Sequence, residues 1–314
     1  LWQLVISAAT LALCELICAL LRRRGALTFL MDYSWVVTAL LLALSLPPLI
    51  PWQYGVAAAL FAGLLVKHAF GGLGMNIFNP AMAGFIFMLI SAPQLMFTCF
   101  VNPVPAALQV ATPQSCAAVI FDGADPGELN AQLKVLRQHS DALSGATYLE
   151  SVKTARKAGT AHQLLQPDFI EGDMRAYVWI AGAYLCGGLL LMATGIIFKR
   201  MVFAFFVAFA GFAWLGWHLW PQIFLPPEAQ LLLGGTMLAG FYIIADPVTN
   251  AGTARGRIVF VILVALLIVV MRGLGSYSDS VAFAVLLGNA MAPLIDVLTR
   301  RRTFGMRLRR HEES

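Results

Sequence analysis

The stretch with the clearest chemical potential runs from Asp141 to Thr147 and reads Asp-Ala-Leu-Ser-Gly-Ala-Thr. Serine is a preferred helix N-cap residue, so we expect Ser144 to begin a short amphipathic helix. Thr147 would then lie at the third helical position, beside unpaired backbone N–H groups and the positive end of the helix dipole. A phosphate group is stabilised at such a position. The pattern fits equally well a capped surface helix that binds nothing.

Two glycine-rich stretches form a second group of candidates, one at residues 71–84 and one at residues 242–257. Asn79-Pro80 and Asp246-Pro247 each fit a helix N-cap followed by proline in the first turn, where no N–H is needed. Glycine lets the backbone approach a ligand closely, so both stretches are also candidates for a ligand site or an ion path. The polar residues available for such a site are Asn76, Asn79, Asp246, Thr249 and Asn250.

The composition decides what kind of protein must position these residues. Of the 314 residues, 60% are apolar and only 12% are charged, whereas soluble chains carry about a quarter charged residues. This excludes an ordinary soluble domain and intrinsic disorder, and five cysteines do not make a disulfide scaffold. The net charge of +5 is what basic cytoplasmic loops would produce, so we expect no nucleic-acid partner.

Apolar stretches long enough to cross a bilayer recur along the chain, and the sequence therefore predicts an all-α polytopic membrane protein. A membrane-spanning helix needs about 20 mostly apolar residues, and short spans need neighbouring helices. Because residue 1 is leucine, we expect the native start, with one N-terminal span, to be missing. The nine predicted spans are 1–21, 28–46, 53–68, 80–97, 176–197, 201–219, 229–245, 257–272 and 279–298.

The distribution of charge predicts the orientation of these spans. Every short loop in one alternating set contains Lys or Arg, and this set with the tail holds 14 of the 21 basic residues; it should be cytoplasmic, with the C-terminus. Residues 98–175 hold eight of the 16 acidic residues and should form an extracytoplasmic lobe.

The spans and the lobe divide the chain into four predicted domains. These are a four-span group (1–97), the lobe with the Thr147 motif (98–175), a five-span group (176–299) and a basic tail (300–314).

Several ionisable residues lie within or beside the predicted spans. Glu15 and Asp296 are each within two turns of a cytoplasmic arginine, so both carboxylates are expected to reach the inner interface, with a cation-relay role as the alternative. Lys67 and His68 are interpreted as topology anchors, and Asp32 and Asp279 as helix caps.

The cysteines and the known catalytic motifs offer little further chemistry. Cys14 and Cys18 share a helical face without further metal ligands nearby, so we expect a packed thiol pair. A disulfide between Cys99 and Cys116 is permitted outside the cytoplasm, and the sequence leaves it open. The sequence contains no hydrolase motif and no dinucleotide fingerprint, so any nicotinamide site would have to lie on a partner chain.

Four stretches of the sequence together indicate a family. The stretch from Asp141 to Thr147 resembles the site at which a bacterial flavin transferase bonds FMN to threonine through a phosphoester. With the two glycine-rich stretches and the segment 279–296, the chain resembles the RnfD proteins of the Rnf electron-transport complexes and the related NqrB proteins of the sodium-translocating NADH:quinone oxidoreductases. The resemblance implies a covalent FMN on Thr147, with Asp141, Ser144, Gly145 and Ala146 completing the motif.

The resemblance also implies a setting for this flavin. The chain would be a multi-pass subunit of a bacterial inner-membrane complex that couples electron transfer between ferredoxin and NAD to movement of Na⁺ or H⁺. Thr147 would lie on the periplasmic side, next to a sister FMN subunit, with iron–sulfur subunits nearby and room for a second flavin such as riboflavin. The chain alone would hold no complete active site. A secondary transporter or channel without a redox role fits the spans and buried carboxylates equally well on physical grounds.

Overall fold

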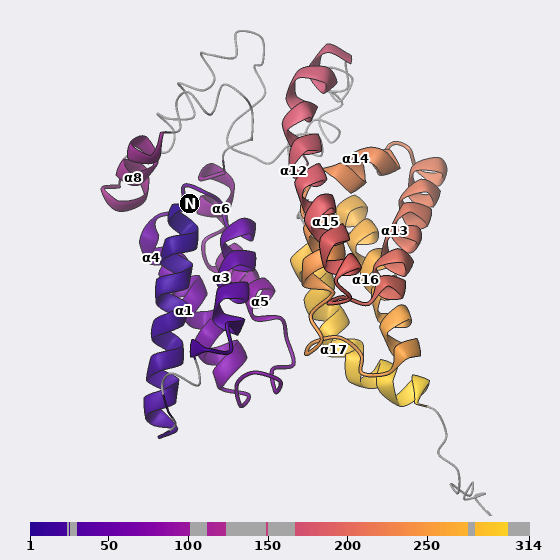
Figure 1. The fold of residues 1–314 in the computed structure, drawn as a ribbon. Coiled ribbons are helices and arrows are strands. Elements are labelled where there is room, and N and C mark those ends of the chain that lie inside the picture. Colours follow the sequence, from indigo (N-terminus) through magenta and orange to yellow (C-terminus); the bar gives the residue numbers. More distant parts are fainter. Residues whose placement is uncertain are drawn as a thin grey trace, which may run out of the picture.

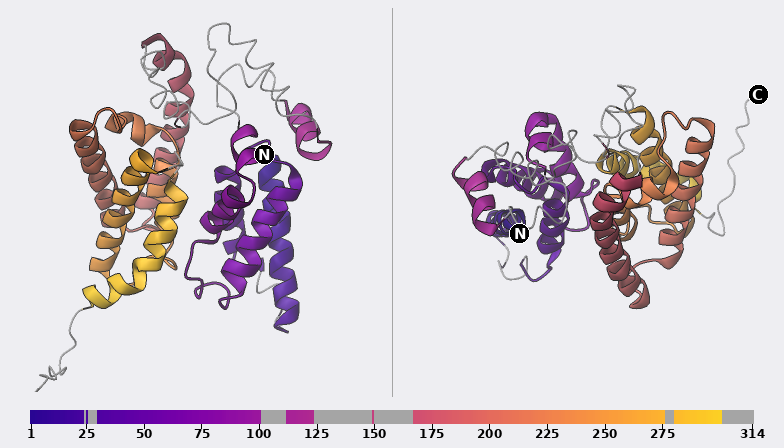
Figure 2. Two further views of the ribbon diagram at one scale, coloured as in Figure 1. Left: turned by 180° about the vertical axis from the view of Figure 1, so that it is seen from behind. Right: turned by 90° about the horizontal axis from the view of Figure 1, so that it is seen from above.

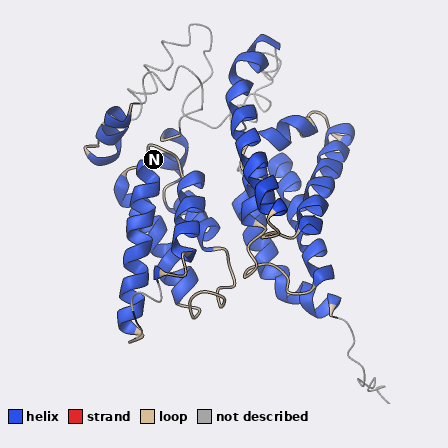
Figure 3. Cartoon of the chain, in the orientation of Figure 1, coloured by secondary structure: helices blue, strands red, loops and turns tan. Residues whose placement is uncertain are grey.

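The computed structural model describes residues 1–23, 25, 30–100, 112–123, 149, 167–275 and 280–300. For residues 167–175 it describes the backbone alone. Within these ranges the chain is helical and contains no strand (Figure 3). Two stretches, labelled η1 and η2, are π-helical. The elements are α1 (Trp2–Leu21), α3 (Ser34–Ser45), α4 (Trp52–Leu60), η1 (Phe61–His68), α5 (Pro80–Ser91), α6 (Pro93–Thr98), α8 (Pro113–Phe121), α12 (Pro167–Ala193), α13 (Lys199–Leu219), α14 (Pro227–Leu232), α15 (Thr236–Leu238), η2 (Ala239–Ile243), α16 (Ala254–Leu274) and α17 (Val281–Thr299).

The helices form two groups that stand side by side in every view (Figures 1 and 2). In the first group, α1–α6, helix α1 packs on α3 and α4, and α5 packs on α3 and η1. In the second group, α12–α17, helix α16 packs between α13 and α17. Helix α17 also packs on α5, which joins the two groups. Helix α8 lies apart at the N-terminus of α1, where its Phe121 ring meets the edge of Trp2.

Five described helices are long and apolar enough to cross a membrane: α1, residues 176–193 of α12, α13, α16 and α17. Helices α3 and α5 are apolar but shorter. Many large apolar side chains on the outward faces are exposed, as expected where lipid rather than water covers the protein. The predicted total of nine spans and the predicted lobe go beyond these five helices and stay predictions.

Small residues bring the helices into close contact. A Cβ atom on Gly84 of α5 would lie 2.8 Å from the Ala58 carbonyl oxygen of α4. On α12, a Cβ atom on Gly188 would overlap the Phe241 ring of η2. Membrane helices associate through such close packing, because lipid tails are as apolar as the side chains. The core of the second group contains the fully buried rings of Phe205, Phe209 and Phe260.

One end of the bundle carries most of the described basic residues, and the opposite end carries α6, α8 and α14 (Figure 1). At the basic end lie the last turn of α1, the loop after η1, the starts of α13 and α16, and the end of α17. We call this the basic end. Both glycine-rich stretches lie there, each after a π-helical segment. π-helical turns are rare and occur frequently at functional sites.

Candidate functional site

Asn79 and Asn289 connect the two helix groups at the basic end. The Asn79 side chain accepts a hydrogen bond from Met82 N–H at 3.2 Å and so caps α5, as the sequence predicts, with Pro80 in the first turn. The backbone N–H of Asn79 donates to Asn289 Oδ1 at 3.1 Å. Asn289, which is 1% exposed, donates in turn through Nδ2 to the Thr249 carbonyl at 2.8 Å. One buried amide of α17 therefore binds both glycine-rich stretches.

The expectation that Asp246 caps a helix is wrong. Asp246 lies in a turn, where its carboxylate accepts hydrogen bonds from Val248 N–H at 3.0 Å and from Thr249 Oγ1 at 2.9 Å. Helix α16 begins eight residues later and is capped by Thr253, whose Oγ1 accepts from Gly256 N–H at 2.9 Å. Asp and Asn stabilise turns and helix starts by the same kind of hydrogen bond, so the Asp-Pro pair alone does not distinguish them.

The remaining polar residues of the two stretches make local contacts. Asn76 donates to the Phe78 carbonyl at 3.2 Å, and Asn250 donates to the Ile244 carbonyl at 3.4 Å. Both side chains are buried. The structure therefore brings Asn79 and Thr249 together through Asn289, while Asn76 and Asp246 stabilise their own loops. Asn250 stabilises its loop and also donates to Met201 Sδ of α13 at 3.8 Å.

Asp296 is half-buried in the last turns of α17, near the basic end, so its expected position at the inner interface and the cation-relay alternative stay predictions. Its two carboxylate oxygens accept hydrogen bonds from the backbone N–H groups of Gly252 at 2.9 Å and Thr253 at 3.1 Å. These N–H groups lie at the start of α16, where the helix dipole favours negative charge. Asp296 of α17 thus caps the neighbouring helix across the helix–helix contact.

Glu15 is the clearest departure from the expected picture, because its side chain is buried inside the first group. It is 1% exposed, and each carboxylate oxygen faces a basic side chain of η1. Lys67 Nζ is hydrogen-bonded to Oε1, and His68 Nε2 lies 3.0 Å from Oε2. Lys67 and His68 are also buried, at most 5% exposed, and their interpretation as topology anchors stays a prediction. The cation-relay alternative for Glu15 stays open.

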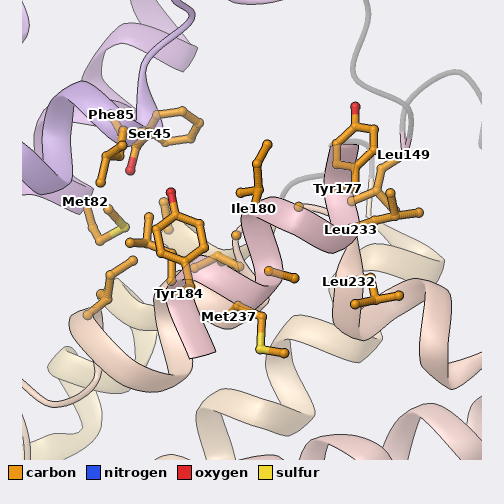
Figure 4. Close-up of a pocket in the computed structure, with 18 of the residues that line it drawn as sticks. Ser45, Met82, Phe85, Leu149, Tyr177, Ile180, Tyr184, Leu232, Leu233 and Met237 are labelled. Carbon is orange, nitrogen blue, oxygen red and sulfur yellow. The ribbon is translucent and has the colours of Figure 1, made fainter. Parts of the chain in front are cut away.

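An apolar pocket of about 220 Å³ lies between the two helix groups (Figure 4). Ser45, Met82 and Phe85 of the first group line one side, and residues of α12, α14, α15, η2 and α17 line the other. Tyr184 of α12 contributes an aromatic wall, and the Tyr242 hydroxyl, which donates to the Tyr184 carbonyl at 3.1 Å, holds its backbone. Leu149 closes one part of the pocket.

A buried arginine lies beside this pocket. Arg272, at the end of α16, donates hydrogen bonds to the carbonyls of Gln230 and Leu233. A Cβ atom on Gly234 would meet both Arg272 Nη2 and Leu149 Cδ1 at 2.8 Å, so these two side chains converge on that glycine. Gly234 also has a φ of +66°, which favours glycine. The positive charge of Arg272 is therefore held close to Leu149, which lies two residues after Thr147 in the sequence.

The Thr147 motif itself, with Asp141, Ser144, Gly145 and Ala146, lies outside the described residues, as do Asp279 and the basic tail. Of the expected cysteine contacts, Cys14 and Cys18 are buried free thiols, as predicted, and Cys99 and Cys116 are also free, so they do not form a disulfide. In the described part of the chain, no group of three or more His, Cys, Asp or Glu side chains could hold a metal ion.

Sequence comparison identifies the family. Residues 1–305 match the NQR2, RnfD, RnfE family. The chain belongs to this family. Its curated relatives include RnfD proteins of ion-translocating oxidoreductase complexes from Escherichia coli and Shigella sonnei, each 39% identical over 310 residues. A relative of the same name from Pectobacterium carotovorum is 39% identical over 308 residues. In each case the alignment covers 97% of this chain and 87% of the relative.

This membership confirms the resemblance that the motifs suggested. The chain is an RnfD-type membrane subunit of an ion-translocating oxidoreductase complex. The names of the relatives support redox involvement at the level of such a complex and imply that it contains other subunits. Sequence reasoning missed Asn289, Arg272 and Tyr184. A buried Asn in an apolar helix and an Arg at a helix end were the available signals, but neither indicates its partner.

Proposed function

We propose that this protein carries one FMN, bonded through its phosphate to the hydroxyl oxygen of Thr147, and passes electrons within its complex. The support is the Asp141-to-Thr147 motif in a chain of this family, together with the pocket lined by Leu149. Two residues span at most about 7 Å of backbone. A group bonded to Thr147 is therefore within reach of the pocket, whatever path the intervening backbone takes.

The residues of the pocket fit the flat, largely apolar ring system of a flavin. Phe85, Ile180 and Tyr184 provide apolar and aromatic surface, and Ser45 and Tyr177 add hydroxyl groups that can form hydrogen bonds. Cofactor sites are typically built from such apolar walls with a few polar groups. We propose that the two helix groups hold the ring between them and exclude water from it.

Arg272 fits the negative charge that this cofactor would bring. Its guanidinium is fixed by the Gln230 and Leu233 carbonyls and is only 8% exposed. A charge in such a position is weakly screened, so it favours a phosphodiester or a negatively charged ring placed near Leu149. When bound, FMN supplies the oxidation and reduction, and the protein orients the ring and tunes its potential.

The complex and its orientation form the second part of the proposal. We propose that the coupled ion is Na⁺ or H⁺, and that electrons are exchanged with an outer-face FMN subunit and with iron–sulfur subunits. The basic end would face the cytoplasm and the Thr147 segment the periplasm of a bacterial inner membrane, since basic residues concentrate in cytoplasmic loops.

We also propose a second flavin, such as riboflavin, at the basic end. The residues available to it are Asn76, Asn79, Asp246, Thr249 and Asn250, whose described hydrogen bonds stabilise the loops and the start of α5.

In-gel fluorescence tests the cofactor assignment. The protein is produced with its complex in cells that contain the flavin transferase, denatured, and viewed under ultraviolet light on a gel. We expect a fluorescent band from the wild type and from Thr154→Ala, a matched threonine in the same segment, and no fluorescence from Thr147→Ala. A dark wild-type band would contradict the proposal and favour a transporter or channel without a redox role.

A further inference from the structure

The buried ion cluster of the first helix group serves no step of the proposed electron transfer. It consists of Glu15 on α1 and of Lys67 and His68 on η1, and all three are at most 5% exposed. Burying charged groups costs several kcal/mol per ion, and a paired cluster is often no more stabilising than apolar residues of the same size. Ionisable groups inside a membrane protein are rare and usually mark ion or proton pathways.

The cluster is connected to the protein surface. Lys67 Nζ donates a hydrogen bond to Ser34 Oγ at the start of α3. Ser34 Oγ donates its own proton to Asp32 Oδ1 at 2.6 Å, and Asp32 is exposed at the basic end. An unbroken chain of exchangeable groups thus runs from a surface carboxylate, through one hydroxyl, to a buried ammonium and its carboxylate partner.

The π-helical geometry of η1 places these groups. Lys67 and His68 are consecutive, yet both reach the carboxylate of Glu15 on the neighbouring helix. Gly63 allows the approach, because a Cβ atom there would meet Leu11 and Cys14 of α1 at 3.0–3.2 Å. Arg22 of α1 fixes the end of η1 by donating to the carbonyls of His68 and Gly71.

We propose that Glu15, Lys67 and His68 form a proton-exchange site that communicates with the basic end through Ser34 and Asp32. Lys67 transfers one proton to Ser34 Oγ while Ser34 releases its hydroxyl proton to the Asp32 carboxylate. Lys67 is then a neutral amine, Asp32 is a carboxylic acid that loses its proton to water, and Ser34 is unchanged. The reverse sequence takes one proton up. The other titratable or charged groups near the cluster are Cys14 and Cys18 on α1 and Arg22 directly after it.

Substitutions at Ser34 and Asp32 test this site without removing a buried charge. The complete complex is assayed in inverted membrane vesicles, with ion movement driven by electron transfer from reduced ferredoxin to NAD and measured across pH. We expect Ser34→Ala and Asp32→Asn to slow ion movement by about 10²-fold, the typical contribution of a positioned proton-transfer group. Ser34→Thr, which retains the hydroxyl, should behave as the wild type. Glu228→Gln, an exposed carboxylate near the opposite end, is the matched control.

Folding and flavin loading are checked separately, by the thermal unfolding midpoint and the fluorescent gel band. Both should be unchanged in the Ser34 and Asp32 variants, so loss of FMN and loss of proton exchange are distinguishable. The proposal is overturned if Ser34→Ala keeps the wild-type rate and pH profile, or if Ser34→Thr is as slow as Ser34→Ala. As a second test, the paired Glu15→Gln/Lys67→Met variant removes both charges together and should reproduce the slow phenotype.

Discussion

The two helix groups contain the same local arrangement at the basic end but fill it with different chemistry. In each group a π-helical segment, η1 or η2, leads into a glycine-containing loop and then into a capped helix. The first arrangement holds the ionisable cluster of Glu15, Lys67 and His68. In the second, the carboxylates of Asp246 and Asp296 accept hydrogen bonds from backbone and hydroxyl groups of the loop between η2 and α16.

This difference indicates whether the local structure at a π-helical segment requires buried ionisable side chains. The second group shows that a π-helical segment and its loop can be stabilised by amides, hydroxyls and carboxylates bonded to N–H groups. Three ionisable side chains buried next to η1 are therefore not a requirement of this local structure. The comparison supports a functional rather than a structural reason for the charges of the first group.

Removing one charge of the cluster should have the largest effect on stability. Glu15→Ala leaves Lys67 buried without its counter-charge, so the free energy of unfolding should fall by about 3–5 kcal/mol. Thermal unfolding of the purified complex measures this. The Glu15→Gln/Lys67→Met pair should recover most of the loss, because no isolated charge remains. An equal loss in the single and paired variants would show that the ion pair itself stabilises the fold.

Breaking the connection between the two groups should have an intermediate effect. Asn289→Leu leaves the Asn79 N–H and the Thr249 carbonyl without their partner, and an unsatisfied buried group costs about 1–3 kcal/mol. The same unfolding measurement applies. Thr194→Ala, at the exposed end of α12, where the hydroxyl bonds to the Leu190 carbonyl of its own helix, is a suitable control. A stability equal to the wild type for Asn289→Leu would mean that the two groups do not depend on this amide.

Removing one helix cap in each group should have the smallest effect. Asn79→Ala and Thr253→Ala each delete a single side-chain acceptor at a helix start, which typically costs about 1 kcal/mol. Because both caps stabilise a helix start by one hydrogen bond, the unfolding midpoints of the two variants should shift by similar amounts. A much larger shift for Asn79→Ala would indicate that this residue also supports a ligand.

The sequence predicts local features better than contacts between distant segments. Asn79-Pro80 is correctly predicted as a cap, since the signal and its hydrogen bond lie within three residues. Asp246 is not, because an Asp-Pro pair suits a turn as well as a helix start. The partners of Glu15 are 52 and 53 residues away, and nothing in the local pattern indicates that a π-helical turn would present both. The positions of Asp296 and Asn289 likewise depend on how α17 packs.

The candidate flavin site shows the same limit. The Thr147 motif points to the family from the sequence, and the comparison with known proteins confirms the family. The pocket is not predictable in this way, because its walls come from both helix groups and from residues as far apart as Ser45 and Val281. Apolar residues in a membrane protein are too common for any of them to mark a cofactor site beforehand.

Mass spectrometry of the peptide that contains Thr147 tests the central claim most directly. The complex is purified from cells with the flavin transferase, digested, and the peptide fragmented to locate any added mass. The account predicts one FMN, less the water lost on forming the phosphoester, on Thr147 and on no other residue of the peptide. An unmodified Thr147 in an active, fully assembled complex would contradict it.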